Sequence, residues 1–92
     1  MPMLHNGLAK LVEECGELGQ VAGKMLQYPA LQTAINISHP DGTFLRERII
    51  EELGDVLAAC EHVAKRLNLD WQRILERRKT KLALFEKWTN QP

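Results

Sequence analysis

Two short groups of acidic residues are the part of this sequence with the clearest chemistry. The groups are Glu13, Glu14 and Glu17, and Glu51, Glu52 and Asp55. Residues three apart in a helix project from neighbouring positions on one face, one turn apart. Carboxylates that converge from two antiparallel helices repel one another unless a cation joins them, and Mg²⁺ or Mn²⁺ suits a set of oxygen ligands. The spacing therefore indicates a divalent-cation site between two helices.

The position of each acid relative to the apolar residues of its helix sharpens this expectation. Helical spacing places Glu14 at the edge of the first apolar stripe, whereas Glu13 points away to solvent. Glu52 borders the second stripe in the same way, and Asp55 lies one step further out. A single acidic pair on a helix is usually only a solvated face. Two pairs that each border an apolar stripe favour a binding site.

Two glycines and one histidine lie near these acids. Gly16 falls inside the first acidic pair and Gly54 inside the second, and a glycine within a helix costs up to about 1 kcal/mol relative to alanine. Either a ligand or a backbone approaches closely there, or the helices pack tightly. His62 lies two turns beyond Asp55 on nearly the same face, and it is either a half-buried structural residue or part of the site.

Helical periodicity of the apolar residues predicts an all-α fold with three main helices. The first two helices carry the acids, and the third comes after them in the sequence. The stripes are Leu8, Leu11, Cys15, Leu18, Ala22 and Met25; Leu45, Ile49, Leu53, Val56, Cys60, Val63 and Leu67; and Ile74, Leu75, Leu82 and Phe85. The helices are expected at about Leu4–Gln27, from Thr43 to Leu67, and Trp71–Trp88.

Residues that favour helix ends set these boundaries. Pro29 stops the first helix, and a weak turn is expected around Ala30–Ile35 in the connection. Thr43 is expected to be the N-cap of the second helix. Asn68 suits the end of that helix, and Asp70 can cap the third.

Length and composition restrict the classes of protein to consider. The chain has 92 residues, 45% of them apolar, which predicts one domain over residues 1–92. A chain this short is expected to be stabilised by packing against a second subunit. Its 12 basic and 12 acidic residues do not resemble the positive surface of a general nucleic-acid binder. No apolar run suits a membrane span, and two cysteines make no disulfide framework or metal-ligand pattern. A cytoplasmic protein with reduced thiols on its apolar helix faces is expected.

The acidic motifs resemble those of a known family. Residues 11–18, LVEECGEL, and residues 51–57, EELGDVL, are similar to the EExxE…ExxD pattern of the MazG-like all-α nucleoside triphosphate pyrophosphohydrolases. This superfamily includes dimeric dUTPases, dCTP pyrophosphatases and phosphoribosyl-ATP pyrophosphatases. The resemblance covers about residues 8–88. It implies Mg²⁺-dependent hydrolysis of a nucleoside triphosphate to a nucleoside monophosphate and pyrophosphate. Such a reaction would suit the removal of unwanted nucleotides from the nucleotide pool.

The resemblance also implies roles for individual residues. The metal ligands it implies, which are also catalytic, are Glu14, Glu17, Glu52 and Asp55, with Glu13 as an accessory catalytic acid. Basic residues should meet the phosphates; Lys79 lies about where relatives carry a lysine, and Arg78 and Lys81 are the next candidates. A solvated basic face is the alternative for these three.

Assembly and substrate choice remain open at this point. A homodimer or homotetramer with a four-helix-bundle-like core is expected, with no nucleic acid or membrane as partner. The competing functions are a phosphoribosyl-ATP, dUTP or dCTP-specific pyrophosphatase of the same superfamily and a helical interaction module without catalysis. The connection between the two motifs is longer than in most relatives, so the motifs do not determine the nucleotide.

Overall fold

The regular secondary structure of the described part of the chain is helical. The computed structural model describes residues 7–28, 36–38 and 43–89. It contains helices α1 (Leu8–Met25), α3 (Leu45–Arg66) and α4 (Trp71–Thr89). Within these residues the only β-type pairing is one isolated bridge between Ser38 and Phe44, so the all-α prediction is confirmed. The turn expected around Ala30–Ile35 lies outside the described residues.

The ends of α3 and α4 follow local capping chemistry. The N-cap of α3 is Phe44 and not Thr43, because the extended Phe44 already offers its carbonyl oxygen to the first helical N–H groups. At the other end, Asn68 takes the left-handed conformation (φ 54°) that closes a helix. The Oδ1 atom of Asp70 accepts hydrogen bonds from the backbone N–H groups of Gln72 (3.0 Å) and Arg73 (3.3 Å). The predicted roles of Asn68 and Asp70 are therefore confirmed.

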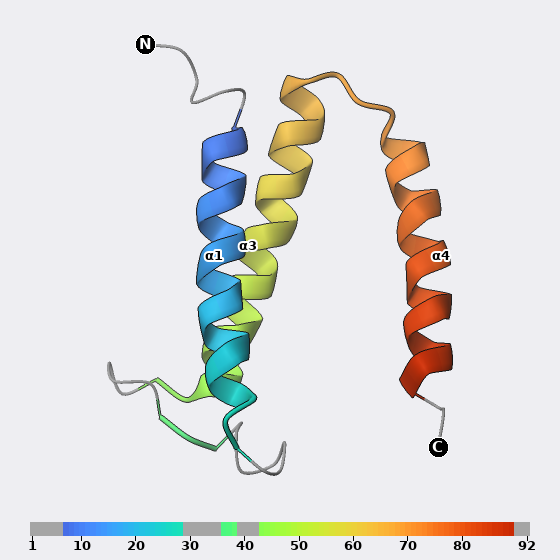
Figure 1. Cartoon of the computed structure of the whole chain (residues 1–92). Helices are drawn as coiled ribbons and strands as arrows, with labels where there is room; N and C mark the ends of the chain where they lie inside the picture. The colour runs from blue at the N-terminus through green and yellow to red at the C-terminus, as the bar shows by residue number, and fades with distance from the viewer. Residues whose placement is uncertain (1–6, 29–35, 39–42, 90–92) are drawn as a thin grey trace.

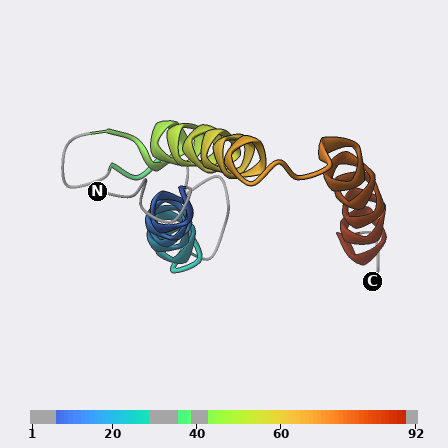
Figure 2. The same cartoon turned by 90° about the horizontal axis from the view of Figure 1, so that it is seen from above.

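Helices α1 and α3 form an antiparallel pair, as Figures 1 and 2 show. The buried apolar residues of the described chain all belong to this pair: Val21, Leu45, Ala59, Val63 and Ala64. Leu45 is completely buried, and its N–H donates a 2.8 Å hydrogen bond to the carbonyl oxygen of Ile37. The seam between α1 and α3 is therefore the framework on which the acidic residues are placed.

The buried face of α3 is rotated relative to the predicted stripe. Leu45 and Val63 are buried as expected, but Leu53 is exposed, and its neighbour Glu52 is buried instead. This difference arises because α1 is the one described helix that packs along α3, and it removes only one narrow side of α3 from solvent. Cys15 and Cys60 are not joined in a disulfide, and both are exposed, so a single chain leaves uncovered the apolar helix faces that they were predicted to fill.

Helix α4 contributes nothing to this core. It stands apart from the α1–α3 pair in both views (Figures 1 and 2), and none of its residues is buried. Ile74, Leu82 and Phe85 are exposed, which corrects the prediction that they are core residues. The helix that the periodicity predicted is present, but none of the other described helices covers its apolar side. None of the described helices is long and apolar enough to span a bilayer.

Candidate metal centre

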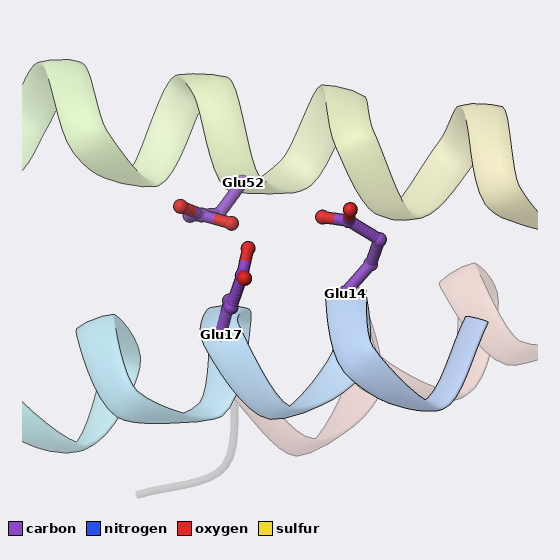
Figure 3. A group of neighbouring side chains, drawn as sticks. All are labelled: Glu14, Glu17 and Glu52. Atoms are coloured by element: carbon purple, nitrogen blue, oxygen red, sulfur yellow. The ribbon is translucent and has the colours of Figure 1, made fainter. Parts of the chain in front are cut away.

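Three carboxylates meet at the seam between α1 and α3. Glu14 and Glu17 project from α1 toward Glu52 on α3 (Figure 3). One oxygen atom of each side chain lies within 4.8 Å of the corresponding oxygen atoms of the other two. The helical spacing in the sequence and the antiparallel pairing together produce this convergence, because each acid is on the side of its helix that faces the partner helix. Such a set of oxygen atoms can surround one divalent cation.

Glu52 is the most unusual member of the cluster because it is almost fully buried. Its exposed fraction is 4%. Its Oε1 atom lies 3.4 Å from Nη2 of Arg48, whereas its buried Oε2 atom has no hydrogen-bond partner among the described residues. Leaving a buried polar group unsatisfied costs about 1–3 kcal/mol, and more for a charged group. A cation at the seam would satisfy this oxygen, so the burial of Glu52 fits a metal ligand.

The electrostatics of Glu14 agree with this interpretation. Burial in the seam raises the pKa of the Glu14 carboxyl, and the negative charges of Glu17 and Asp55 raise it further, while Lys10 opposes the shift. Its Oε2 atom is also buried without a hydrogen-bond partner in the described part of the chain. Crowded carboxylates favour their protonated form until a positive charge joins them. The positive charge of a divalent cation would oppose both the burial and the repulsion that raise the pKa of Glu14.

The remaining predicted acids occupy different positions. Asp55 is exposed, and it is not one of the three residues whose oxygen atoms lie within 4.8 Å of one another. Its negative charge nevertheless raises the pKa of Glu14, and both residues line the same cleft. It therefore stays a predicted fourth ligand at the edge of the cluster. Glu13 points outward, as expected, and both of its carboxylate oxygens lie 3.3 Å from Nζ of Lys10. Its predicted accessory role has no geometric support within one chain.

The predicted phosphate-binding residues lie away from the cluster in a single chain. Arg78, Lys79 and Lys81 belong to α4, which stands apart from the seam (Figure 1). Arg78 and Lys79 are exposed, and Nζ of Lys81 lies 5.8 Å from the centre of the Phe85 ring. Any contact between these residues and a phosphate bound at the seam would need the α4 helix of another subunit.

Two other basic residues, Lys24 and Arg48, lie next to the cluster, and they were not predicted from the sequence. They line a cleft of about 450 Å³ formed by Glu17, Gln20, Val21, Lys24, Arg48 and Glu52. The available signal was helical spacing: Lys24 lies two turns beyond Glu17, and Arg48 one turn before Glu52. This spacing puts both basic residues on the same faces as the acids. The cleft opens directly from two of the three clustered carboxylates.

A second cleft lies on the other side of the cluster. It measures about 320 Å³ and is lined by Lys10, Glu14, Asp55, Ala58, Ala59 and His62. His62 is exposed, so it is not the half-buried structural histidine that one interpretation expected. A side chain at Gly7, where φ is 88°, would place its Cβ only 2.6 Å from Cδ2 of His62. The glycine at position 7 thus lets the start of α1 approach the imidazole closely.

The glycines inside the acidic motifs have no close neighbours. A Cβ atom added at Gly16 or Gly54 would meet no atom within 4 Å among the described residues. Tight packing of helices within one chain therefore does not explain either glycine. Space at both positions remains for a ligand or for another subunit.

Comparison with known proteins identifies no relative of this chain. The chain matches no known family, no curated protein and no solved structure. No relative therefore indicates the chemistry of the site, which follows only from the residues that form it. These residues form a half-buried acidic cluster, with Glu52 almost fully buried, flanked by one cleft that contains Lys24 and Arg48 and by another that contains Lys10, two alanines and His62.

Proposed function

We propose that this chain is an Mg²⁺-dependent nucleoside triphosphate pyrophosphohydrolase, as the resemblance to the MazG-like family implies. The observation that carries this proposal is the buried carboxylate of Glu52, which faces Glu14 and Glu17 across the seam and has one oxygen without a hydrogen-bond partner in the described chain. An acid in such a place is costly unless a cation binds. Mg²⁺ characteristically bridges a few carboxylates and substrate phosphates.

The residues of the cluster would have distinct tasks in this reaction. Glu14, Glu17 and Glu52 would hold the cation, with Asp55 completing the set from the exposed edge. The bound cation supplies charge neutralisation for the triphosphate and activation of a water molecule. The water oxygen forms a bond to the α-phosphorus, and the bond between that phosphorus and the bridging oxygen breaks. The electron pair leaves with pyrophosphate, and the proton of the water passes to solvent.

A helical interaction module without catalysis is the alternative from another class. Nothing in such a module would require a carboxylate to be buried against two others. Replacing a buried ionic group by an apolar residue of similar size is often neutral or stabilising. The burial of Glu52 at the centre of the seam therefore favours the enzyme.

The proposal is tested by incubating the protein with Mg²⁺ and a set of ribo- and deoxyribonucleoside triphosphates, together with phosphoribosyl-ATP. We expect equal amounts of nucleoside monophosphate and pyrophosphate from at least one of them, and no product when EDTA removes Mg²⁺. Activity restricted to dUTP, dCTP or phosphoribosyl-ATP would identify a specific member of the superfamily. Release of orthophosphate and a nucleoside diphosphate would contradict attack at the α-phosphorus, and the absence of any hydrolysis would contradict the enzyme.

We also propose that two or more copies assemble into a four-helix-bundle-like core. This proposal is supported by the large apolar side chains that remain exposed on both α3 and α4: Ile50, Leu53, Leu57, Leu82, Phe85 and Trp88. Monomers rarely leave contiguous apolar surface of this kind in water. A second copy is the partner that offers the same surface in return.

Assembly is tested by multi-angle light scattering after size-exclusion chromatography. We expect the mass of two or four chains for the wild type and of one chain for the variant Leu53→Glu/Leu57→Glu, because two charges would be buried without partners. The control is Leu26→Glu, since Leu26 is 85% exposed at the end of α1. A wild-type mass of one chain at about 50 μM, a concentration at which stable dimers with sub-micromolar Kd persist, would contradict the proposal.

A further inference from the structure

We propose that the substrate lies along the α1–α3 seam in one direction, with its β- and γ-phosphates in the cleft of Lys24 and Arg48 and its nucleoside toward Ala58 and His62. This inference rests on the proposed function, because it assumes that the α-phosphate meets a cation held by the three carboxylates. It assigns a binding role to Lys24 and Arg48, and it makes Ala58 and His62 determinants of nucleoside binding.

The residues that line the two clefts place them on either side of the acidic cluster along the α1–α3 seam. Glu17 and Glu52 line the cleft that contains Lys24 and Arg48. Glu14 belongs to the same cluster but lines the other cleft, together with Asp55. A molecule held at the cluster by one of its central groups can therefore extend into both clefts. A nucleoside triphosphate held at its α-phosphate has this form, because the other phosphates and the nucleoside leave in opposite directions.

The cleft of Lys24 and Arg48 suits the phosphate end. It combines an ammonium group, a guanidinium group and the side-chain amide of Gln20, and all three carry hydrogen-bond donors. The guanidinium of Arg48 already lies 3.4 Å from Glu52 and 3.7 Å from Glu51. Arginine has five N–H donors, so it can bind a phosphate oxygen while it keeps a carboxylate partner. The ion pair with the buried Glu52 therefore positions Arg48 at the cleft.

The opposite cleft suits the nucleoside end. Ala58 and Ala59 leave room beside Asp55, and His62 offers an imidazole that can stack or form a hydrogen bond. Its one basic side chain, Lys10, lies 3.3 Å from both carboxylate oxygens of Glu13. This cleft is smaller than the cleft around Arg48, but it provides less positive charge for a phosphate and a more apolar lining for a sugar and a base.

The direction is tested by calorimetric titration of the assembled protein with two ligands in the presence of Mg²⁺. The ligands are inorganic pyrophosphate and the nucleoside monophosphate of the best substrate. Lys24→Gln and Arg48→Gln are expected to weaken pyrophosphate binding by about tenfold or more each, since each removes a charge-assisted hydrogen bond, and to leave monophosphate binding almost unchanged. Ala58→Leu should weaken monophosphate binding by a similar factor and spare pyrophosphate, because leucine fills the cleft.

Matched controls distinguish these effects from a general loss of charge or of folding. Arg66→Gln removes an arginine from the far end of α3, and Ala83→Leu enlarges an exposed alanine on α4; both should bind as the wild type does. The pattern opposite to the expected one, with weaker monophosphate binding in Lys24→Gln and Arg48→Gln, would show that the substrate lies the other way, with its nucleoside in the cleft of these two residues. Unchanged binding of both ligands in all three test variants would overturn the assignment.

Because binding is measured without turnover, the result is independent of the proposed reaction. Pyrophosphate binding that depends on Lys24 and Arg48 in a protein that hydrolyses no triphosphate would support the phosphate cleft and contradict the enzyme. Hydrolysis by a protein whose pyrophosphate binding does not change in Lys24→Gln or Arg48→Gln would support the enzyme and contradict the direction.

Discussion

Replacing Glu52 by glutamine is expected to lower kcat for triphosphate hydrolysis by about 100-fold or more, because it removes a negative ligand from the centre of a site whose catalysis is mainly electrostatic. Glutamine has nearly the same shape as glutamate. Its amide can occupy the buried position, so the helices should remain paired and the circular dichroism spectrum should not change. The loss is measured as the rate of pyrophosphate release at saturating nucleotide and Mg²⁺.

A suitable control for this prediction is Glu61→Gln, which makes the same chemical change on the exposed side of the same helix. This variant should retain the wild-type rate. If Glu52→Gln also kept a rate near that of the wild type, Glu52 would have no part in catalysis, and the burial of its carboxylate would need another explanation.

Divalent cations are expected to stabilise the folded protein strongly. At a cation concentration 100 times the dissociation constant, binding to the folded state alone adds about 2.7 kcal/mol to the free energy of unfolding. For a domain of this size such a change corresponds to a rise in Tm of about 10 °C or more. The cation also offsets the burial and the repulsion by Glu17 and Asp55 that raise the pKa of Glu14. The measurement is thermal unfolding followed by circular dichroism, with and without Mn²⁺ or Mg²⁺.

Neutralising one of the clustered acids should raise the Tm without metal and reduce the rise in Tm that the metal causes. Without metal, Glu17→Gln should unfold at a higher temperature than the wild type, because one of three close negative charges is gone. With Mn²⁺, its Tm should rise much less than that of the wild type. Equal metal-dependent shifts in the wild type and in Glu17→Gln would place the cation elsewhere.

Local features of the structure could be predicted well from the sequence because they depend on neighbouring residues. Asp70 caps α4 through its own side chain, and Asn68 ends α3 through its own left-handed backbone. The spacing of Glu14 and Glu17 on α1 determines that both face the same way, and Glu52 meets them once α3 packs antiparallel. These inferences needed only helix geometry.

Features that depend on the partner of each helix could not be predicted in the same way. The apolar periodicity of α4 is clear, but it does not say whether the same chain or another copy covers Leu82 and Phe85. In α3 the buried position is Glu52 and not Leu53, because the choice depends on which side α1 occupies. Arg48 is different, because it lies one turn before Glu52 and helix geometry alone places it beside the acids.

The central claim is that Glu14, Glu17 and Glu52 bind a divalent cation together, and a crystal structure with Mn²⁺ tests it most directly. We expect an anomalous scattering peak between α1 and α3, about 2.1 Å from at least one oxygen of each of these three carboxylates. The same crystals of Glu52→Gln should show a much weaker peak or none. A wild-type structure in which Mn²⁺ binds elsewhere, or in which this seam contains no metal at a concentration that supports hydrolysis, would contradict the claim.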